Sequence, residues 1–197
     1  MKKIDLTMHL NEQTPSYTEI EQVRINQDIN DAFILSTIKQ SVHTGTHIDT
    51  PLHMRKGNKT IMDYPLNRFF GNARLFDVIG QNPITDLNAY DMIQPGDIIL
   101  LRTGYNYQTS NYPVISETLA RKLIEKKIGM LGIDTPSPDT IPFPIHHLLF
   151  EHDILILENL VNLNALPLNK TFTLEAYPLP YDLEASPTRV IATIDND

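Results

Sequence analysis

The sequence predicts an α/β fold that is rich in strands and has few helices. Short apolar, β-branched runs of strand length recur along the 197 residues, and proline and glycine separate them. One segment with helical periodicity stands between two of these runs, and 41% of the residues are hydrophobic, enough to build a buried core. Because the chain shows neither a linker nor a repeat, we expect one domain over residues 1–197.

The predicted strands are the runs at residues 33–38, 73–79, 97–103, 129–133, 153–157, 172–176 and 189–194. The clearest helix covers residues 116–127: Ser116 is a suitable N-cap, and an apolar stripe runs through Leu119 and Leu123. It lies between the third and fourth strands and therefore predicts a βαβ-like unit. Weaker helical patterns cover residues 87–93 and 145–150.

Composition excludes several classes of function. A net charge of −8 argues against a nucleic-acid partner, whose phosphates require a basic surface. The longest apolar runs, residues 98–101 and 154–157, are too short to span a membrane, and polar residues interrupt any signal peptide near the N-terminus. We therefore expect no membrane partner and a cytoplasmic location. The absence of cysteine excludes a thiol nucleophile and a thiolate zinc site.

Residues 43–53 (His-Thr-Gly-Thr-His-Ile-Asp-Thr-Pro-Leu-His) bring three histidines and one carboxylate together. Imidazole nitrogens and carboxylate oxygens are the ligands that zinc or manganese takes when no thiolate is offered. A straight strand from His43 to Asp49 would span about 20 Å, too far for ligands of one ion, so the chain must curl. Gly45 can take the positive φ that a curl requires. The alternative interpretation is a polar loop with solvated histidines.

A second group of candidate ligands lies downstream, at His146-His147 and Glu158. Glu158 ends an apolar strand, where a carboxylate is costly unless it is paired or bound to a metal. Taken alone, these residues fit an exposed turn and a surface-facing strand end, but Glu158 could complete the metal site of the first segment. Asp134 also ends a strand, and we interpret it as a turn aspartate that accepts backbone N–H bonds.

The segment at 43–53 resembles the His-x-Gly-Thr-His-x-Asp-x-Pro-x-His signature of the cyclase family of metal-dependent hydrolases, which includes bacterial kynurenine formamidase and isatin hydrolase. The resemblance continues at residues 132–139, 146–147, 154–160 and 186–189. It implies a swivelling β/β/α domain that forms homodimers or higher homo-oligomers. It also implies roles for individual residues: His43, His47 and Asp49 on a first metal ion, Asp49 and Glu158 bridging to a second, His146 on that second ion, and His53 as the catalytic acid/base.

The resemblance implies a metal-dependent amidohydrolase, first of all an arylformamidase that converts N-formyl-kynurenine to kynurenine and formate in tryptophan catabolism. One or two Zn²⁺ ions per chain are expected, with Mn²⁺ as the alternative. The competing hypotheses are a cyclic amide or lactone hydrolase of the isatin hydrolase type and a non-catalytic, metal-dependent binding protein. The family's N-terminal aromatic-Pro-Gly-Asp pattern is missing, and Tyr17 is the candidate aromatic contact for the substrate. Other candidates for an aromatic wall are Phe69, Phe70 and Phe143.

Overall fold

The computed structural model describes residues 1–16, 22–55, 57–168 and 170–195. Its strands are β1 (Lys2–Asp5), β2 (Arg24–Ile29), β3 (Ile34–Lys39), β4 (His47–Asp49), β5 (Phe70–Asp77), β6 (Ile98–Arg102), β7 (Met130–Ile133), β8 (Leu155–Glu158), β9 (Thr171–Pro178) and β10 (Ala185–Ile194). The α-helices are α1 (Glu117–Glu125) and α2 (Pro144–Glu151). Within these ranges, no helix has both the length and the apolar character needed to cross a membrane.

In the described part of the chain, seven strands close into a barrel in the order β10-β4-β8-β7-β6-β5-β9, because β9 pairs with both β5 and β10. Strands β5 to β8 are parallel, and α1 connects β6 to β7, which confirms the predicted βαβ unit. The three-residue strand β4 runs antiparallel between β8 and β10. Outside the barrel, β1 extends the sheet along β10.

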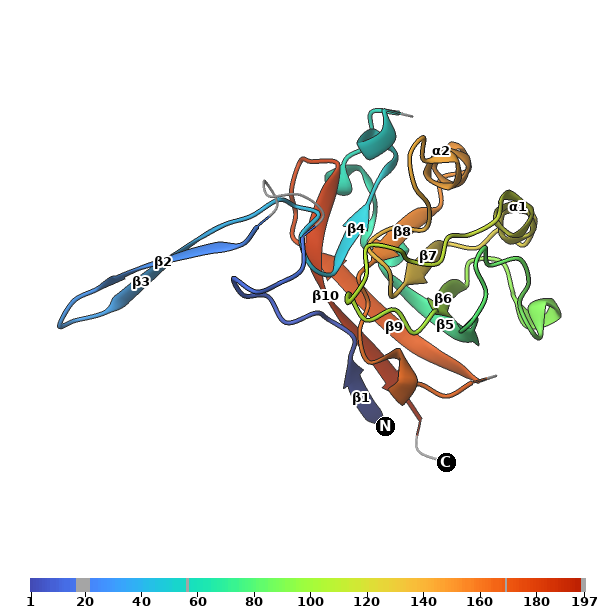
Figure 1. The fold of residues 1–197 in the computed structure, drawn as a ribbon, viewed down its shortest axis with the longest axis horizontal. Helices are drawn as coiled ribbons and strands as arrows, with labels where there is room; N and C mark the ends of the chain where they lie inside the picture. Colours follow the sequence, from blue (N-terminus) through green and yellow to red (C-terminus); the bar gives the residue numbers. More distant parts are fainter. Residues whose placement is uncertain (17–21, 56, 169, 196–197) are drawn as a thin grey trace.

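The core has two layers because the apolar strands are buried on both faces. In β6, Ile98 and Leu100 pack inside the barrel, whereas Ile99 and Leu101 pack outward beneath the helices. This alternation has the period of two that a strand imposes, and a continuous apolar run is typical of a strand covered on both sides. The result is a β/β/α arrangement, with α1 and α2 on one side of β5–β8 and with β9 and β10 on the other (Figure 1). It confirms the predicted strand-rich α/β fold.

The helices begin where the sequence provides caps. Ser116 precedes α1, and its hydroxyl accepts a hydrogen bond from the backbone N–H of Leu119 at 3.2 Å. At the start of α2, the Asp139 carboxylate accepts from the backbone N–H groups of Ile145 (2.6 Å) and His146 (3.1 Å). This second cap fixes the turn of helix that carries His146.

The prediction of a helix at residues 87–93 was wrong. Only a short 3₁₀ helix, Tyr90–Met92, forms there, after Ala89 adopts a left-handed backbone with φ 61°. Leu87 and Ile93, which suggested helical periodicity, are both buried, but they enter the core from an irregular turn. Strands β1, β2 and β4 were not predicted.

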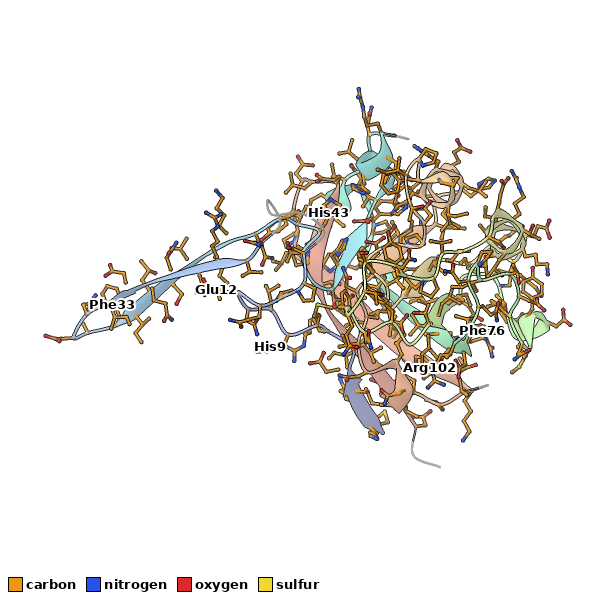
Figure 2. All side chains as sticks on the ribbon, viewed as in Figure 1. His9, Glu12, Phe33, His43, Phe76 and Arg102 are labelled. Atoms are coloured by element: carbon orange, nitrogen blue, oxygen red, sulfur yellow. The ribbon has the colours of Figure 1, made fainter. Side chains whose placement is uncertain are left out.

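Residues 24–39 form a hairpin arm, made of β2 and β3, that extends away from the barrel (Figure 1). Figure 2 shows Phe33 towards its far end and His43 where the chain returns to the barrel. The arm has exposed apolar side chains: Ile29, Phe33, Ile34, Leu35 and Ile38, which are 56–67% exposed. An isolated two-stranded hairpin is at best marginally stable in water. The arm therefore exposes apolar side chains for which the barrel provides no cover.

Candidate metal centre and active site

The segment at 43–53 curls at Gly45, as its sequence predicts. Gly45 has φ +69°, and from there the chain enters β4, which carries His47 and Asp49 on the same face. Because β4 pairs with β8, His47 lies directly opposite Glu158. The sheet thus brings together ligand candidates that lie far apart in the sequence.

Five of the predicted side chains converge at the end of β8. The Nδ1 of His43 lies 3.0 Å from Asp49 Oδ1, and the Nε2 of His47 lies 3.3 Å from both Asp49 Oδ1 and Glu158 Oε2. One potential ligand atom from each of His47, Asp49 and Glu158 lies within 4.8 Å of the others. From α2, the Nε2 of His146 lies 3.3 Å from Glu158 Oε1 and 4.0 Å from Asp49 Oδ2.

In the described part of the chain, the buried polar atoms at the centre of this cluster face one another but form no well-aligned hydrogen bond. They are His47 Nε2, both carboxylate oxygens of Asp49, and Glu158 Oε1. Each of these side chains is at most 5% exposed. Buried carboxylates held only by poorly aligned contacts with imidazoles are unfavourable, and the same atoms are a suitable donor set for a borderline divalent cation. These residues therefore fit a metal ion.

The electrostatics of the cluster favour a bound positive charge. Burial alone would lower the pKa of His47, but Asp49 and Glu158 outweigh it and raise that pKa well above its usual value. Burial would likewise raise the pKa of Asp49, yet His47 and His43 hold it well below its usual range. The Asp49 carboxylate thus stays ionised and attracts protons to the imidazoles or a cation between them.

His53 lies on the 3₁₀ helix Pro51–Met54, at the wall of the same site. Its ring centroid is 4.2 Å from that of His43 and 5.9 Å from that of His146. Burial lowers the pKa of His53 and outweighs the attraction of Asp49, so the imidazole is neutral at pH 7 and can accept a proton. A nitrogen of His53 also lies within 4.8 Å of potential ligand atoms of His43 and Asp49. Its position is compatible with proton transfer and with metal binding.

A cavity of about 990 Å³ opens over the cluster. His43, His47, His53, His146 and Glu158 lie on its wall, and its aromatic lining comes from Tyr105, Tyr107, Tyr112 and Phe143. Of the other aromatic candidates, Phe69 is buried in the barrel interior and Phe70 is 43% exposed on β5. Tyr17 lies outside the described residues.

Two residues that support the cluster were missed in the sequence. Asp139 accepts a hydrogen bond from His146 Nδ1 at 2.7 Å, which turns the Nε2 of His146 towards the carboxylates. Asn159 donates from Nδ2 to the backbone carbonyl of Gly45 at 2.9 Å. Two features of the sequence could have pointed to these residues. Asp139 precedes a predicted helix, and Asn159 directly follows Glu158.

Asp134 has the structural role expected from its sequence position. Its carboxylate accepts the backbone N–H groups of Thr103 at 2.9 Å and Gly104 at 3.0 Å, together with the Thr103 hydroxyl at 2.6 Å. It therefore anchors the loop that follows β6.

Comparison with known proteins shows similarity along most of the chain. The profile of the family named Cyclase, described as "Putative cyclase", matches residues 4–140. Kynurenine formamidase from Bacillus mycoides (strain KBAB4) is 33% identical over 163 residues, which cover 78% of this chain and 77% of that protein. Kynurenine formamidase from Bacillus cytotoxicus is 30% identical over 171 residues, covering 80% and 81%.

Solved structures share the fold. The structure of a "predicted metal-dependent hydrolase" from Bacillus stearothermophilus is 32% identical and has a TM-score of 0.84, with 97% of both chains covered. Isatin hydrolase A from Labrenzia aggregata is 24% identical, with a TM-score of 0.83 and coverage of 97% of this chain and 93% of that one. At that identity the likeness concerns the fold alone.

Proposed function

This chain belongs to the cyclase family of metal-dependent hydrolases, and we propose that it hydrolyses the amide bond of an aryl formamide, with N-formyl-kynurenine as the first candidate substrate. The observation that carries the proposal is the convergence of buried ligand atoms of His47, Asp49 and Glu158, which form no well-aligned hydrogen bond in the described residues and lie beside an aromatic-lined cavity. Two relatives at 30–33% identity are named kynurenine formamidase, which supports the choice of substrate.

We assign the metal ligands from the convergence of side chains. His43, His47 and Asp49 would hold a first ion, and Asp49, Glu158 and His146 would hold a second. Zn²⁺ is our first choice and Mn²⁺ the second, because both accept imidazole and carboxylate ligands. A bound divalent ion supplies Lewis acidity, which lowers the pKa of a water ligand towards ~7 and polarises the scissile carbonyl.

The protein's own groups perform the remaining steps. His53, neutral at pH 7 and facing the cavity, accepts the proton from the attacking water and returns it to the departing amine nitrogen. Asp139 holds the His146 ring by its Nδ1–H and so keeps Nε2 directed at Glu158. Tyr105, Tyr107 and Phe143 provide the apolar wall that holds an aromatic ring and excludes water from it.

Removal of the metal should abolish the activity reversibly. The purified protein should contain one or two divalent ions per chain, and dialysis against a chelator should remove both the ions and the hydrolysis of N-formyl-kynurenine. Adding back Zn²⁺ or Mn²⁺ should restore turnover. The measurement is elemental analysis alongside rates on a panel of N-formyl-kynurenine, isatin and lactones.

The same panel separates the alternatives. Asp49→Ala should lose the ions, and full metal content in that variant would remove Asp49 from the site. Turnover of isatin or a lactone in place of N-formyl-kynurenine would reassign the protein to cyclic amide or lactone hydrolysis. Metal binding with no turnover of any substrate would favour a non-catalytic, metal-dependent binding protein.

We also propose that residues 1–197 act as one domain and that the protein is a homodimer or a higher homo-oligomer. The apolar hairpin arm supports the assembly, since a second copy of the chain could cover the exposed surface that the barrel leaves open. The proposed partner of the site is a small molecule, and the net charge of −8 disfavours nucleic acid. We propose that the protein is located in the cytoplasm and has no membrane partner.

Polar substitutions on the hairpin arm should dissociate the oligomer. The double variant Phe33→Ser, Leu35→Ser removes two of the large exposed apolar side chains, so light scattering should show a monomer mass. Gln27→Ala is the matched control, because its side chain lies on the same arm and pairs only with Ser36 at 3.2 Å in the described contacts. A wild-type monomer, or a double variant of unchanged mass, would contradict the role of the arm.

A further inference from the structure

A tyrosine-bearing loop, residues 103–112, forms one wall of the cavity and also contacts Asn159, the residue after the candidate ligand Glu158. Its first residues are anchored by Asp134, through the N–H groups of Thr103 and Gly104. At its far end, the Tyr112 hydroxyl donates to the backbone carbonyl of Asp139 at 3.0 Å. The loop is thus fixed at both ends, and Tyr105 and Tyr107 lie between them on the cavity wall.

Tyr107 has an unfavourable backbone conformation that its contacts must maintain. Its φ is 61°, in the left-handed region that bulky residues rarely adopt. The side chain is half-buried, and its hydroxyl hydrogen-bonds to Oδ1 of Asn159. Backbone strain at a residue that reaches into a cavity is a reason to seek a function for its side chain.

The hydrogen bonds of Tyr107 lead directly to a candidate metal ligand. A carbonyl can only accept, so the Asn159 group that bonds to the Gly45 carbonyl is Nδ2, and the Tyr107 hydroxyl donates to Oδ1. The same Gly45 carbonyl accepts from His47 Nδ1 at 2.9 Å. His47 is therefore held with its Nε2, one of the unpartnered buried atoms, facing Asp49 and Glu158.

We propose that Tyr107 is a positioning residue, which acts through Asn159 and the Gly45 carbonyl to orient the His47 ring for metal binding. The inference rests on the proposed function. When the hydroxyl is removed, the Asn159 amide loses the partner that fixes its rotation, and its bond to Gly45 weakens. The His47 ring then loses part of the support that sets its tautomer and plane. Partners of this kind, which contact a ligand and not the ion, typically contribute ~10–100-fold in metal affinity.

Tyr107→Phe tests the proposal, with Tyr105→Phe as its matched control. Both variants keep the ring and lose one hydroxyl from the same loop, but the Tyr105 hydroxyl donates to the Thr109 carbonyl within the loop. Metal-free protein is titrated with Co²⁺, and the visible absorption spectrum reports the ligand arrangement. We expect Tyr107→Phe to bind Co²⁺ several-fold more weakly, with an altered spectrum and a reduced kcat at unchanged KM. Tyr105→Phe should bind Co²⁺ with the wild-type affinity and give the wild-type spectrum.

Asn159→Gly is the second variant, because glycine accepts the left-handed φ of 58° found at that position. It should weaken Co²⁺ binding by roughly 10–100-fold. Wild-type Co²⁺ affinity and spectrum in both Tyr107→Phe and Asn159→Gly would overturn the inference and leave the proposed function intact. An equal effect of Tyr105→Phe would also overturn it, by showing a general effect of the loop. Failure of the wild type to bind Co²⁺ would reject the proposed function together with this inference.

Discussion

Replacing His53 with alanine should lower kcat by roughly 10²–10⁴-fold while the metal content stays at the wild-type level. The reason is a separation of roles within residues 43–53. In our assignment His43, His47 and Asp49 hold the first ion, whereas the His53 ring lies beyond Pro51 at the cavity wall. Burial keeps that ring neutral at pH 7, the state that a general base requires.

Steady-state kinetics with N-formyl-kynurenine and elemental analysis of the same sample would test the role of His53. His152→Ala is the control, since His152 is an exposed histidine at the end of α2. Loss of an ion from His53→Ala would identify His53 as a ligand, which its distance from His43 and Asp49 allows. Near-wild-type turnover would mean that another group transfers the proton.

Replacing Glu158 with glutamine should lose an ion and reduce metal affinity by about 100-fold or more. Glutamine has nearly the same shape, so packing at the end of β8 is kept while the negative charge disappears. The Glu158 carboxylate lies 3.3 Å from imidazole nitrogens of both His47 and His146, whereas Asp49, the other carboxylate beside them, is 4.0 Å from His146. A 100-fold weaker affinity lowers the stabilisation by saturating metal by about 2.7 kcal/mol.

The measurement is thermal unfolding with and without Zn²⁺, combined with elemental analysis. The increase in Tm on adding Zn²⁺ should be large for the wild type and small for Glu158→Gln. Glu175→Gln, on β9, is the control because Glu175 makes only a weak ion pair with Lys3 at 3.9 Å among the described contacts. Unchanged metal content in Glu158→Gln would remove this residue from the ligand set.

The parts of the fold that the sequence predicts are those whose local pattern agrees with their final environment. Strands β6 to β8 are continuous apolar runs buried on both faces, and α1 has a cap and a stripe that the structure uses. Strand β4 has no such pattern. Its three residues pair with residues 156–158 and 185–187, which only the tertiary fold brings near. The arm strand β2 is largely exposed, and its sequence, Arg-Ile-Asn-Gln-Asp-Ile, has no apolar run like the one that predicted its exposed partner β3.

The residues of the site also divide into those that the sequence predicts and those that only the structure reveals. The residues that resemble a family motif are recognisable by type and spacing. Asn159 donates to the backbone carbonyl of Gly45, and Tyr107 reaches that carbonyl only through the Asn159 side chain; a carbonyl is present at every residue. Contacts of that kind leave no pattern in the sequence. Their positions become apparent only when the loop after β6 is seen to reach the end of β8.

The place of β4 in the barrel determines when the site can form during protein synthesis. Strand β4 pairs with β8 on one side and with β10 on the other, so its neighbours are made long after it. His43, His47 and Asp49 leave the ribosome well before Glu158, and the barrel cannot close around them until β10 has been synthesised. Such distant pairings also make folding slow. The proposed ligand set is therefore complete only after β8 and β10 have been synthesised and paired with β4, and we expect metal binding to follow that pairing.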